Sequence, residues 1–255
     1  MRLDKALVEL EKTHTRSQSK DLILRGKVIV NDIVVMKPSF NCSPEDKIEI
    51  TEDKIYVSRG AHKLLSALQA FQDVIIADKI IADLGASTGG FTEVLLERQC
   101  QLVYAIDVGE NQLHDSLRNN DKVISMEGVN LKNTLTLPER VDLCVGDLSF
   151  ISLTKILPTA YELLKDQGEA ILLFKPQFEV GKENLPRDGV VKNKEMILDY
   201  LTSFYHYSQK LGFAVKNLTS CGIKGKTGNQ EYFFHLQKNV MNLSEKDWEV
   251  FCKIL

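Results

Sequence analysis

After residue 60 the chain alternates short, continuous apolar runs with longer stretches in which apolar residues recur at helical spacing. Such runs are typical of strands buried on both faces of a parallel sheet, and the stretches between them predict covering helices. We expect strands near 79–84, 102–107, 122–125, 141–147, 169–174, 213–219 and 231–237. We expect helices near 60–72, 89–98, 112–118, 153–165 and 194–210. Pro158 either kinks the first turn of the fourth helix or leaves that turn in the preceding loop. A short Gly- and Lys-rich turn joins the last two strands, which predicts an antiparallel edge pair that closes the sheet.

The first 52 residues follow a different pattern, in which two short helical stretches precede short strands. Ser17 is a candidate cap for the second helix, and Gly26 follows its end. Residues 28–34 then predict a hairpin through the turn Asn31-Asp32, and residues 47–50 supply a further strand. The beginning of the chain is therefore expected to form a small α+β domain.

These patterns predict an α/β protein with two domains. We expect a small domain over 1–52, a linker over 53–59, an α/β domain over 60–240 and a closing helix over 241–255. Trp248 lies on the apolar face of that last helix, which favours docking of the helix on the α/β domain. Stacking of Trp248 on a nucleic-acid base is the alternative.

A glycine-rich turn connects the first strand of the α/β domain to a helix, in the segment IIADLGASTGGFTEVLL that begins at Ile80. Glycines let backbone N–H groups approach a ligand closely, and the following helix directs its positive end at an anion. A dinucleotide fingerprint would need a third glycine where Ser87 stands, which argues against NAD. The spacing from Asp83 to Gly89 is the one expected for S-adenosylmethionine. A tight turn that binds nothing is the alternative.

Asp107 ends the second strand, where an acidic residue of a doubly wound sheet holds ribose hydroxyls. Asn130, after the third strand, is a weaker candidate for a contact with adenine. The predicted cofactor-binding residues are Asp83, Gly85, Ala86, Ser87, Thr88, Gly89, Gly90, Asp107 and Asn130.

Four further polar residues stand at the ends of predicted elements, which should converge on the carboxyl edge of the sheet. They are Lys63, Asp147, Lys175 and Glu231. Each alone has an ordinary explanation, since lysines at strand ends are usually solvated and an aspartate before serine often caps a turn. Together, beside a loop of this kind, they are candidate catalytic residues.

Composition restricts the classes of protein. The chain has 255 residues and a net charge of −3, and its five cysteines are too scattered to predict a disulfide framework or a zinc site. No uncharged stretch approaches the roughly 20 residues that span a bilayer, and the beginning of the chain does not look like a signal peptide. We therefore expect a cytoplasmic protein without a metal and without a membrane partner.

The net negative charge conceals a basic beginning. Residues 1–40 contain eight Lys and Arg residues against five Asp and Glu residues. A mixed-charge helical surface is usually only solvated, but basic residues on a small α+β domain are also placed to meet phosphates. The candidate RNA-binding residues are Arg2, Arg16, Lys20, Arg25, Lys27 and Arg59.

The beginning of the chain resembles the α-L RNA-binding fold first known from a small-subunit ribosomal protein. The whole chain resembles the hemolysin-A-type ribosomal RNA methyltransferases, which join that domain to a 2′-O-ribose methyltransferase domain related to heat-shock RNA methyltransferases. The matching blocks are VSRGAHKL, DLGASTGGFTEVLL, AIDVG, DLSFISL, KPQFEVGK, DGVV and GNQEYF, and blocks this long are specific.

The resemblance implies a Rossmann-like, seven-stranded methyltransferase that uses S-adenosylmethionine on ribosomal RNA or ribosomal subunits, at cytidine. It also implies that Lys63, Asp147, Lys175 and Glu231 form a K-D-K-E catalytic tetrad. We expect Lys175 to be the general base and Lys63 to tune it, although the two lysines could exchange roles. The chain departs from the family pattern at Glu110-Asn111, beside the cofactor ribose.

Three other functions are considered. Membrane lysis, which the family's historical name suggests, lacks a spanning segment or a strongly amphipathic basic helix. A non-catalytic ribosome-assembly factor would be expected to lose the tetrad or the glycine loop, and both are present. A base methyltransferase would ordinarily carry Asn/Asp-Pro-Pro-aromatic or a nucleophilic cysteine, whereas this chain has Asp147-Leu148-Ser149-Phe150, and Cys144 is expected to pack inside the strand. The sequence leaves the oligomeric state open.

Overall fold

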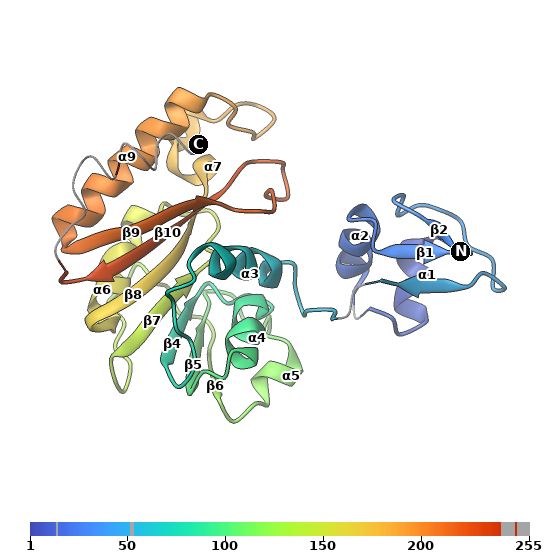
Figure 1. Ribbon diagram of the computed structural model, residues 1–255, viewed down its shortest axis with the longest axis horizontal. Coiled ribbons are helices and arrows are strands. Elements are labelled where there is room, and N and C mark those ends of the chain that lie inside the picture. The colour runs from blue at the N-terminus through green and yellow to red at the C-terminus, as the bar shows by residue number, and fades with distance from the viewer. Residues whose placement is uncertain (14, 52–53, 241–247, 249–255) are drawn as a thin grey trace. The chain divides into compact units, whose positions relative to one another are not determined.

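The computed structural model describes residues 1–13, 15–51, 54–240 and 248. The chain divides into two compact units, one from Met1 to Arg59 and the other beginning at Gly60 (Figure 1). The closing helix expected over 241–255 lies outside the described residues, apart from Trp248. Trp248 is buried and stacks on Tyr205, with ring centroids 4.2 Å apart, so the alternative in which it stacks on a nucleic-acid base is wrong.

The first unit packs two helices against a small antiparallel sheet with strand order β2-β1-β3. Its elements are α1 (Leu3–Glu9), α2 (Arg16–Leu24), β1 (Val28–Val30), β2 (Ile33–Val34) and β3 (Ile48–Ile50). Leu3, Ala6 and Leu7 of α1 and Leu22 and Ile23 of α2 are buried in one core with β1, because their spacing places them on the inner faces of the helices, whereas Leu24 is exposed. Positive φ angles of 48° at Asn31 and 64° at Asp32 form the tight turn between β1 and β2.

The cap of α2 differs from the expectation. Thr15, not Ser17, is the cap: its hydroxyl accepts from the backbone N–H of Gln18 at 3.2 Å, and the Gln18 side chain accepts from the Thr15 N–H at 3.1 Å. This reciprocal pair places the cap two residues before the expected one. Ser17 therefore lies inside the first turn.

The second unit contains a seven-stranded sheet with the order β6-β5-β4-β7-β8-β10-β9. Its strands are β4 (Ile80–Leu84), β5 (Leu102–Ile106), β6 (Val123–Met126), β7 (Val141–Gly146), β8 (Leu164–Phe174), β9 (Phe213–Ser220) and β10 (Tyr232–Lys238). The first five pair in parallel. The expected antiparallel pair of β9 and β10 is present, and β10 is also antiparallel to β8, so β10 lies inside the sheet while β9 forms its edge.

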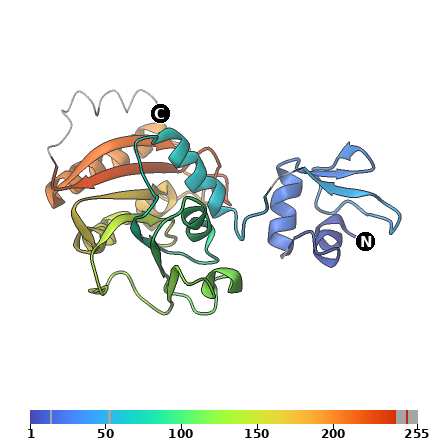
Figure 2. The same ribbon diagram turned by 60° about the horizontal axis from the view of Figure 1, so that its bottom comes forward.

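Helices cover both faces of this sheet (Figures 1 and 2). They are α3 (Gly60–Ala70), α4 (Gly90–Glu97), α5 (Asp115–Arg118), a 3-10 turn (Leu153–Lys155), α6 (Leu157–Leu163), α7 (Pro176–Glu179), α8 (Gly181–Asn184) and α9 (Lys194–Leu211). Successive residues of β10 face opposite layers: Phe233 packs near Phe91 of α4, and Phe234 near Phe204 of α9. The sequence pattern did not predict the short helices α7 and α8. Pro158 lies in the first turn of α6, where it needs no N–H donor, and the turn before it is 3-10.

The topology brings distant parts of the sequence to one edge. The parallel strands β4, β5, β7 and β8 all end at the same side of the sheet. Because β10 runs antiparallel to β8, it begins at that side. Residues that follow the parallel strands and residues that precede β10 are therefore neighbours in space.

Candidate active site

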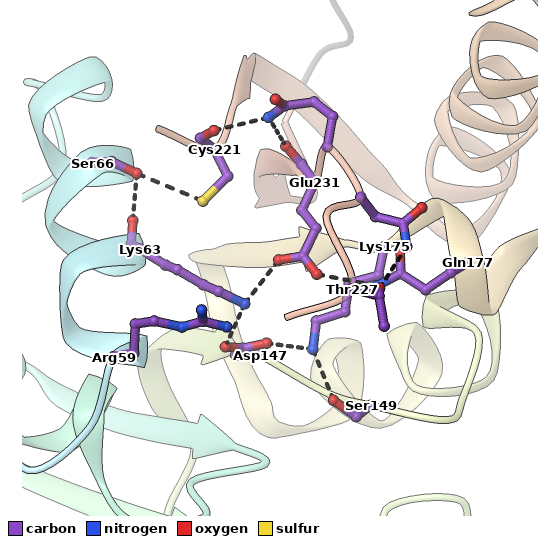
Figure 3. A network of polar contacts seen from close by, with 12 residues as sticks. Arg59, Lys63, Ser66, Asp147, Ser149, Lys175, Gln177, Cys221, Thr227 and Glu231 are labelled. Carbon is purple, nitrogen blue, oxygen red and sulfur yellow. Dashed lines mark hydrogen bonds and ion pairs between the residues drawn. The ribbon is translucent and has the colours of Figure 1, made fainter. Parts of the chain in front are cut away.

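The four candidate catalytic residues lie together at this edge of the sheet (Figure 3). Lys63 is on α3, Asp147 directly follows β7, Lys175 directly follows β8, and Glu231 directly precedes β10. Lys63, Lys175 and Glu231 are buried, although charged side chains are rarely buried unless they are paired. Each contributing element is anchored in the sheet or in the layer that covers it, which fixes the four side chains relative to one another.

Asp147 connects the two lysines. Its Oδ1 lies 2.6 Å from Lys175 Nζ, and its Oδ2 accepts a hydrogen bond from Lys63 Nζ at 3.2 Å. Lys63 Nζ also donates to Glu231 Oε2 at 2.8 Å. Lys63 therefore lies between two carboxylates, whereas Lys175 faces only one (Figure 3).

These pairs shift the titration of the buried groups. Burial disfavours the charge on Lys63, but Asp147 and Glu231 outweigh it and raise the pKa of Lys63 above its ordinary value. Burial also disfavours the charge on Asp147, and Lys175 and Lys63 together outweigh it and lower the pKa of that carboxyl. At neutral pH, Lys63 is therefore an ammonium and Asp147 a carboxylate.

Two residues that the sequence analysis did not single out complete the network. Lys175 Nζ donates to Ser149 Oγ at 2.9 Å, and Gln177 Nε2 donates to Glu231 Oε1 at 3.2 Å. Ser149 stands two residues after Asp147, and Gln177 two residues after Lys175. The proximity of these polar residues in sequence was the available signal, but their partners come from other elements.

The loops that carry Asp147 and Lys175 are fastened to each other beyond the tetrad. Glu179 Oε2 accepts from Ser152 Oγ at 2.6 Å, and its Oε1 accepts from the backbone N–H of Leu153 at 2.9 Å. The rings of Phe150 and Phe178 also pack, with centroids 5.1 Å apart. Both loops are thus held as one unit, which stabilises the spacing between Asp147 and Lys175.

The glycine-rich loop has the conformation that a close ligand approach requires. Gly85 and Gly89 adopt φ angles of +83° and +98°, and Gly89 is the N-terminal cap residue of α4. A Cβ at Gly85 would lie 3.3 Å from Leu148 Cγ, and one at Gly89 would lie 2.2 Å from Leu117 Cδ1. The positive φ angles disfavour side chains at both positions, and at Gly89 Leu117 would also have to move. The loop therefore fits a small ligand that contacts the backbone.

Asp83 lies under this loop and is completely enclosed. Its Oδ2 accepts from Thr92 Oγ1 at 2.7 Å, while its Oδ1 has no hydrogen-bond partner among the described residues. Burial raises the pKa of Asp83 to about 7, against the effect of the Thr92 hydrogen bonds. An unpaired buried carboxylate oxygen is suited to a cationic ligand, because it can accept from an ammonium there.

Asp107 lies beside the loop. Its Oδ2 accepts from the backbone N–H of Ser87 at 2.8 Å, and its Oδ1 accepts from that of Gly109 at 2.7 Å. Ser87 Oγ donates to Gln112 Oε1 at 3.2 Å, a contact that the sequence analysis did not predict. Glu127 holds the segment 111–113 through three backbone N–H groups, in the region where the chain departs from the family pattern.

The remaining candidates for cofactor binding form hydrogen bonds within the protein. The backbone N–H groups of Gly85 and Ala86 both donate to the carbonyl of Ile106, and Thr88 accepts from the N–H of His114. Asn130 is exposed, and its side chain accepts from the backbone N–H of Lys132 at 3.0 Å. Its amide oxygen is thus occupied by a local turn.

Four of the six candidate RNA-binding residues engage carboxylates within the first unit. Arg2 and Arg16 both pair with the buried Asp4, at 3.0 Å and 2.8 Å, and the hydrogen bond from Arg2, aided by Arg16, holds the pKa of Asp4 well below its usual range. Both guanidinium groups remain about half exposed. Asp4 thereby holds two cations in a fixed geometry at the surface.

The other pair shares Asp21. Arg25 lies 2.8 Å and Arg59 3.8 Å from its carboxylate oxygens. Lys20 is exposed and Lys27 partly exposed, and neither forms an ion pair with a residue that the structure describes. Among the six candidates, these two lysines are the least committed.

Two features are absent from the part of the chain that the structure describes. Among those residues, no group of three or more His, Cys, Asp or Glu side chains is placed to hold a metal ion. No helix in the described ranges has the length and apolar character needed to cross a membrane.

The strand order, the glycine loop after β4 and the acidic residue after β5 define an S-adenosylmethionine-dependent methyltransferase. The model of the FtsJ-like methyltransferase family matches residues 56–238, and the S4 domain matches residues 1–48. The 16S/23S rRNA (cytidine-2′-O)-methyltransferase TlyA of Mycobacterium tuberculosis is 38% identical over 240 residues, which cover 92% of this chain and 89% of that protein. The chain belongs to the FtsJ-like methyltransferase family, within the TlyA group that carries an N-terminal S4 domain.

Two further similarities extend over nearly the whole chain. Hemolysin A of Brachyspira hyodysenteriae is 37% identical, over 92% of this chain and 99% of that protein. A solved structure from Streptococcus thermophilus superimposes with a TM-score of 0.77 at 34% identity, covering 99% of this chain and 94% of that one. The Rossmann-like fold expected from the sequence, with its small α+β domain, is confirmed.

Proposed function

We propose that this protein transfers a methyl group from S-adenosylmethionine to a ribose 2′-oxygen of ribosomal RNA, at cytidine, with Lys63, Asp147, Lys175 and Glu231 as the catalytic tetrad. The observation that carries the proposal is the pairing of two lysines through one carboxylate beside the cofactor loop. The names of the relatives support the substrate, since the M. tuberculosis protein is named for cytidine-2′-O methylation of 16S and 23S rRNA.

The unequal surroundings of the two lysines support different roles for them. Lys63 is held between Asp147 and Glu231, which raise its pKa, so it remains an ammonium and stabilises the oxyanion that develops on the 2′-oxygen. Lys175 faces one carboxylate oxygen and the neutral hydroxyl of Ser149. We therefore propose Lys175, which faces fewer carboxylates than Lys63, as the acceptor for the proton of the 2′-hydroxyl.

The acidic members of the tetrad fix this arrangement. Asp147 orients Lys63 and Lys175 through separate oxygens, and Glu231 holds Lys63 while Gln177 holds Glu231. S-adenosylmethionine, when bound, supplies a methyl group on a sulfonium, which is an excellent leaving group. The protein's task is therefore alignment and proton removal, for which no metal is needed.

The cofactor residues divide by chemistry. The N–H groups of Gly85, Ala86 and Ser87 already donate within the protein, so the N–H groups at the start of α4 are the ones suited to the methionyl carboxylate. The unpaired Oδ1 of Asp83 is suited to the methionyl ammonium. Asp107 has remaining lone pairs for the ribose hydroxyls, although both its oxygens already accept backbone N–H groups. Asn130 is proposed as a contact near the adenine.

The first unit is proposed to bind the RNA backbone. Its half-exposed arginines and the uncommitted Lys20 and Lys27 suit phosphate contacts, which give salt-sensitive affinity with little dependence on sequence. Such a protein works on ribosomal RNA or ribosomal subunits in the cytoplasm.

The test is transfer of radiolabelled methyl groups from S-adenosylmethionine to unmodified 16S and 23S rRNA and to both ribosomal subunits. We expect label on a ribose 2′-oxygen with the wild type and with Lys155→Ala, an exposed lysine outside the site, and none with Lys175→Ala. No transfer to any of these RNAs by folded protein that binds the cofactor would refute the catalytic proposal and favour a non-catalytic assembly factor.

A further inference from the structure

Asn229 is a buried polar residue to which the mechanism above assigns no role. Its Oδ1 accepts from the backbone N–H of Val191 at 2.9 Å. Its Nδ2 donates to the carbonyl of Gly189 at 2.8 Å and to Thr227 Oγ1 at 2.9 Å. The side chain is completely inaccessible to solvent, so all these bonds are formed away from water. Asn229 thus joins two loops that are distant in sequence.

The two loops are residues 185–193, between α8 and α9, and residues 222–230, between β9 and β10 (Figure 1). We call them the Asn229 loop pair. The second loop rests directly on the tetrad: Gly225 donates its N–H to the carbonyl of Asn229 at 2.9 Å, and a Cβ at Gly225 would lie 2.6 Å from Glu231 Oε1. The loop pair therefore borders the catalytic carboxylate.

The loop pair carries exposed positive charge. Arg187, Lys224 and Lys226 are exposed, and none of them forms an ion pair with another described residue. Lys192, by contrast, is paired with Asp188 at 2.8 Å. Unpaired cations beside a site for a ribose are suited to the phosphates on either side of that ribose.

We propose that the Asn229 loop pair is a second RNA-binding surface, in which Arg187, Lys224 and Lys226 contact phosphates that flank the target nucleotide. Asn229 is its positioning residue, because it fixes the two loops to each other next to Glu231. This inference rests on the proposed function, since it names how the same site takes its RNA. It places phosphate contacts on the methyltransferase unit itself, in addition to those of the S4 domain.

The first test removes charge without touching the core. Binding of unmodified 16S and 23S rRNA to the full chain is measured against salt concentration for the wild type, Lys224→Ala/Lys226→Ala and the control Lys210→Ala/Lys216→Ala. The control removes two exposed lysines of α9 and β9. Each lost phosphate contact lowers the slope of log affinity against log salt by about 0.7 to 0.9. We expect a decrease of about 1.5 for the loop variant and no change for the control.

If Lys224→Ala/Lys226→Ala shows the same slope of log affinity against log salt as the control, the proposal is overturned. Because this measurement is a binding measurement, it is independent of methyl transfer. Wild-type protein that binds RNA through the loop pair but transfers no methyl group would sink the catalytic proposal and leave the surface standing.

The second test addresses Asn229. In Asn229→Asp the oxygen that replaces Nδ2 faces the carbonyl of Gly189, so the two loops lose their connection while the bond from Val191 remains possible. We expect the KM for RNA to rise about tenfold, with kcat at saturating RNA and affinity for the cofactor little changed. In the Lys224→Ala/Lys226→Ala background, Asn229→Asp should raise the KM for RNA by a smaller factor than it does in the wild-type background. A lower melting temperature with an unchanged KM for RNA would show a purely structural role and overturn this assignment.

Discussion

Asp83 offers a test of the site that needs no RNA. The carboxylate is buried under the glycine loop with one oxygen unpaired among the described residues, and burial raises its pKa to about 7. We predict that Asp83→Asn stabilises the unliganded protein at pH 8 and weakens its binding of S-adenosylmethionine. The substitution keeps the size of the side chain and an acceptor for Thr92, but removes the charge.

The magnitude follows from linkage. In the unfolded chain an aspartate loses its proton near pH 4, whereas Asp83 in the folded protein keeps it to about pH 7. The unfolded state therefore binds fewer protons over this range, and the free energy of unfolding falls as the pH rises from about 4 to about 7. This loss amounts to roughly 1 kcal/mol at pH 5 and about 4 kcal/mol at pH 8.

Asp83→Asn removes this pH-dependent loss of stability. It also places an amide N–H without a partner where Oδ1 was, which costs about 1–3 kcal/mol of stability at every pH. We therefore expect the free energy of unfolding of the variant, measured relative to that of the wild type, to be about 3 kcal/mol higher at pH 8 than at pH 5. Urea unfolding can be followed by the fluorescence of the single tryptophan, Trp248, which is buried against Tyr205 in the methyltransferase unit. The same stability difference at both pH values would refute the reasoning. Calorimetry should show weaker cofactor binding by the variant, because the carboxylate that attracts the cation is gone.

Three other predictions test separate parts of the structure. Lys63→Met should destabilise the protein by about 3–5 kcal/mol in urea unfolding, because Glu231 stays buried without its cation, whereas Lys175→Met should cost less. Glu169, at the start of the apolar part of β8, contacts Lys79 at 2.9 Å and His235 at 3.1 Å, and against the effect of burial the hydrogen bonds of His235 and Lys79 lower its pKa to about 2. Glu169→Gln should therefore cost up to about 3 kcal/mol at pH 7, and thermal melts should show this difference shrinking as the pH falls from about 4.5 to 2. Gly85→Ala, at φ +83°, should abolish cofactor binding in calorimetry while the S4 domain still binds RNA.

The sequence predicted the strands well because buried parallel strands are marked by local apolar runs. It also placed Asp147 and Lys175 at strand ends, since both directly follow such runs. Position along the chain together with sheet topology was enough to bring them to one edge. The position of β10 between β8 and β9 was not predicted, because the turn before it specifies pairing with β9 but says nothing about its other neighbour.

The side-chain contacts of the site could not be predicted from the sequence, for a different reason. Ser149 and Asn229 are ordinary loop residues in the sequence, and their contacts depend on elements that only tertiary packing brings near. The cap of α2 shows the same limit on a smaller scale. Thr15 and Ser17 are both good caps by composition, and the choice of Thr15 depends on its reciprocal bond with Gln18.

The interior position of β10 has a consequence for when the enzyme becomes active during its own synthesis. The strand that inserts between β8 and β9 is the last of the sheet to be made, and Glu231 arrives with it. Until then β8 lacks its antiparallel neighbour, and Lys63 lacks the closer of its two carboxylates. A nascent chain still attached to a ribosome through this region lacks Glu231, one member of the proposed tetrad. On the proposed mechanism, methyl transfer is reserved for molecules whose sheet has closed.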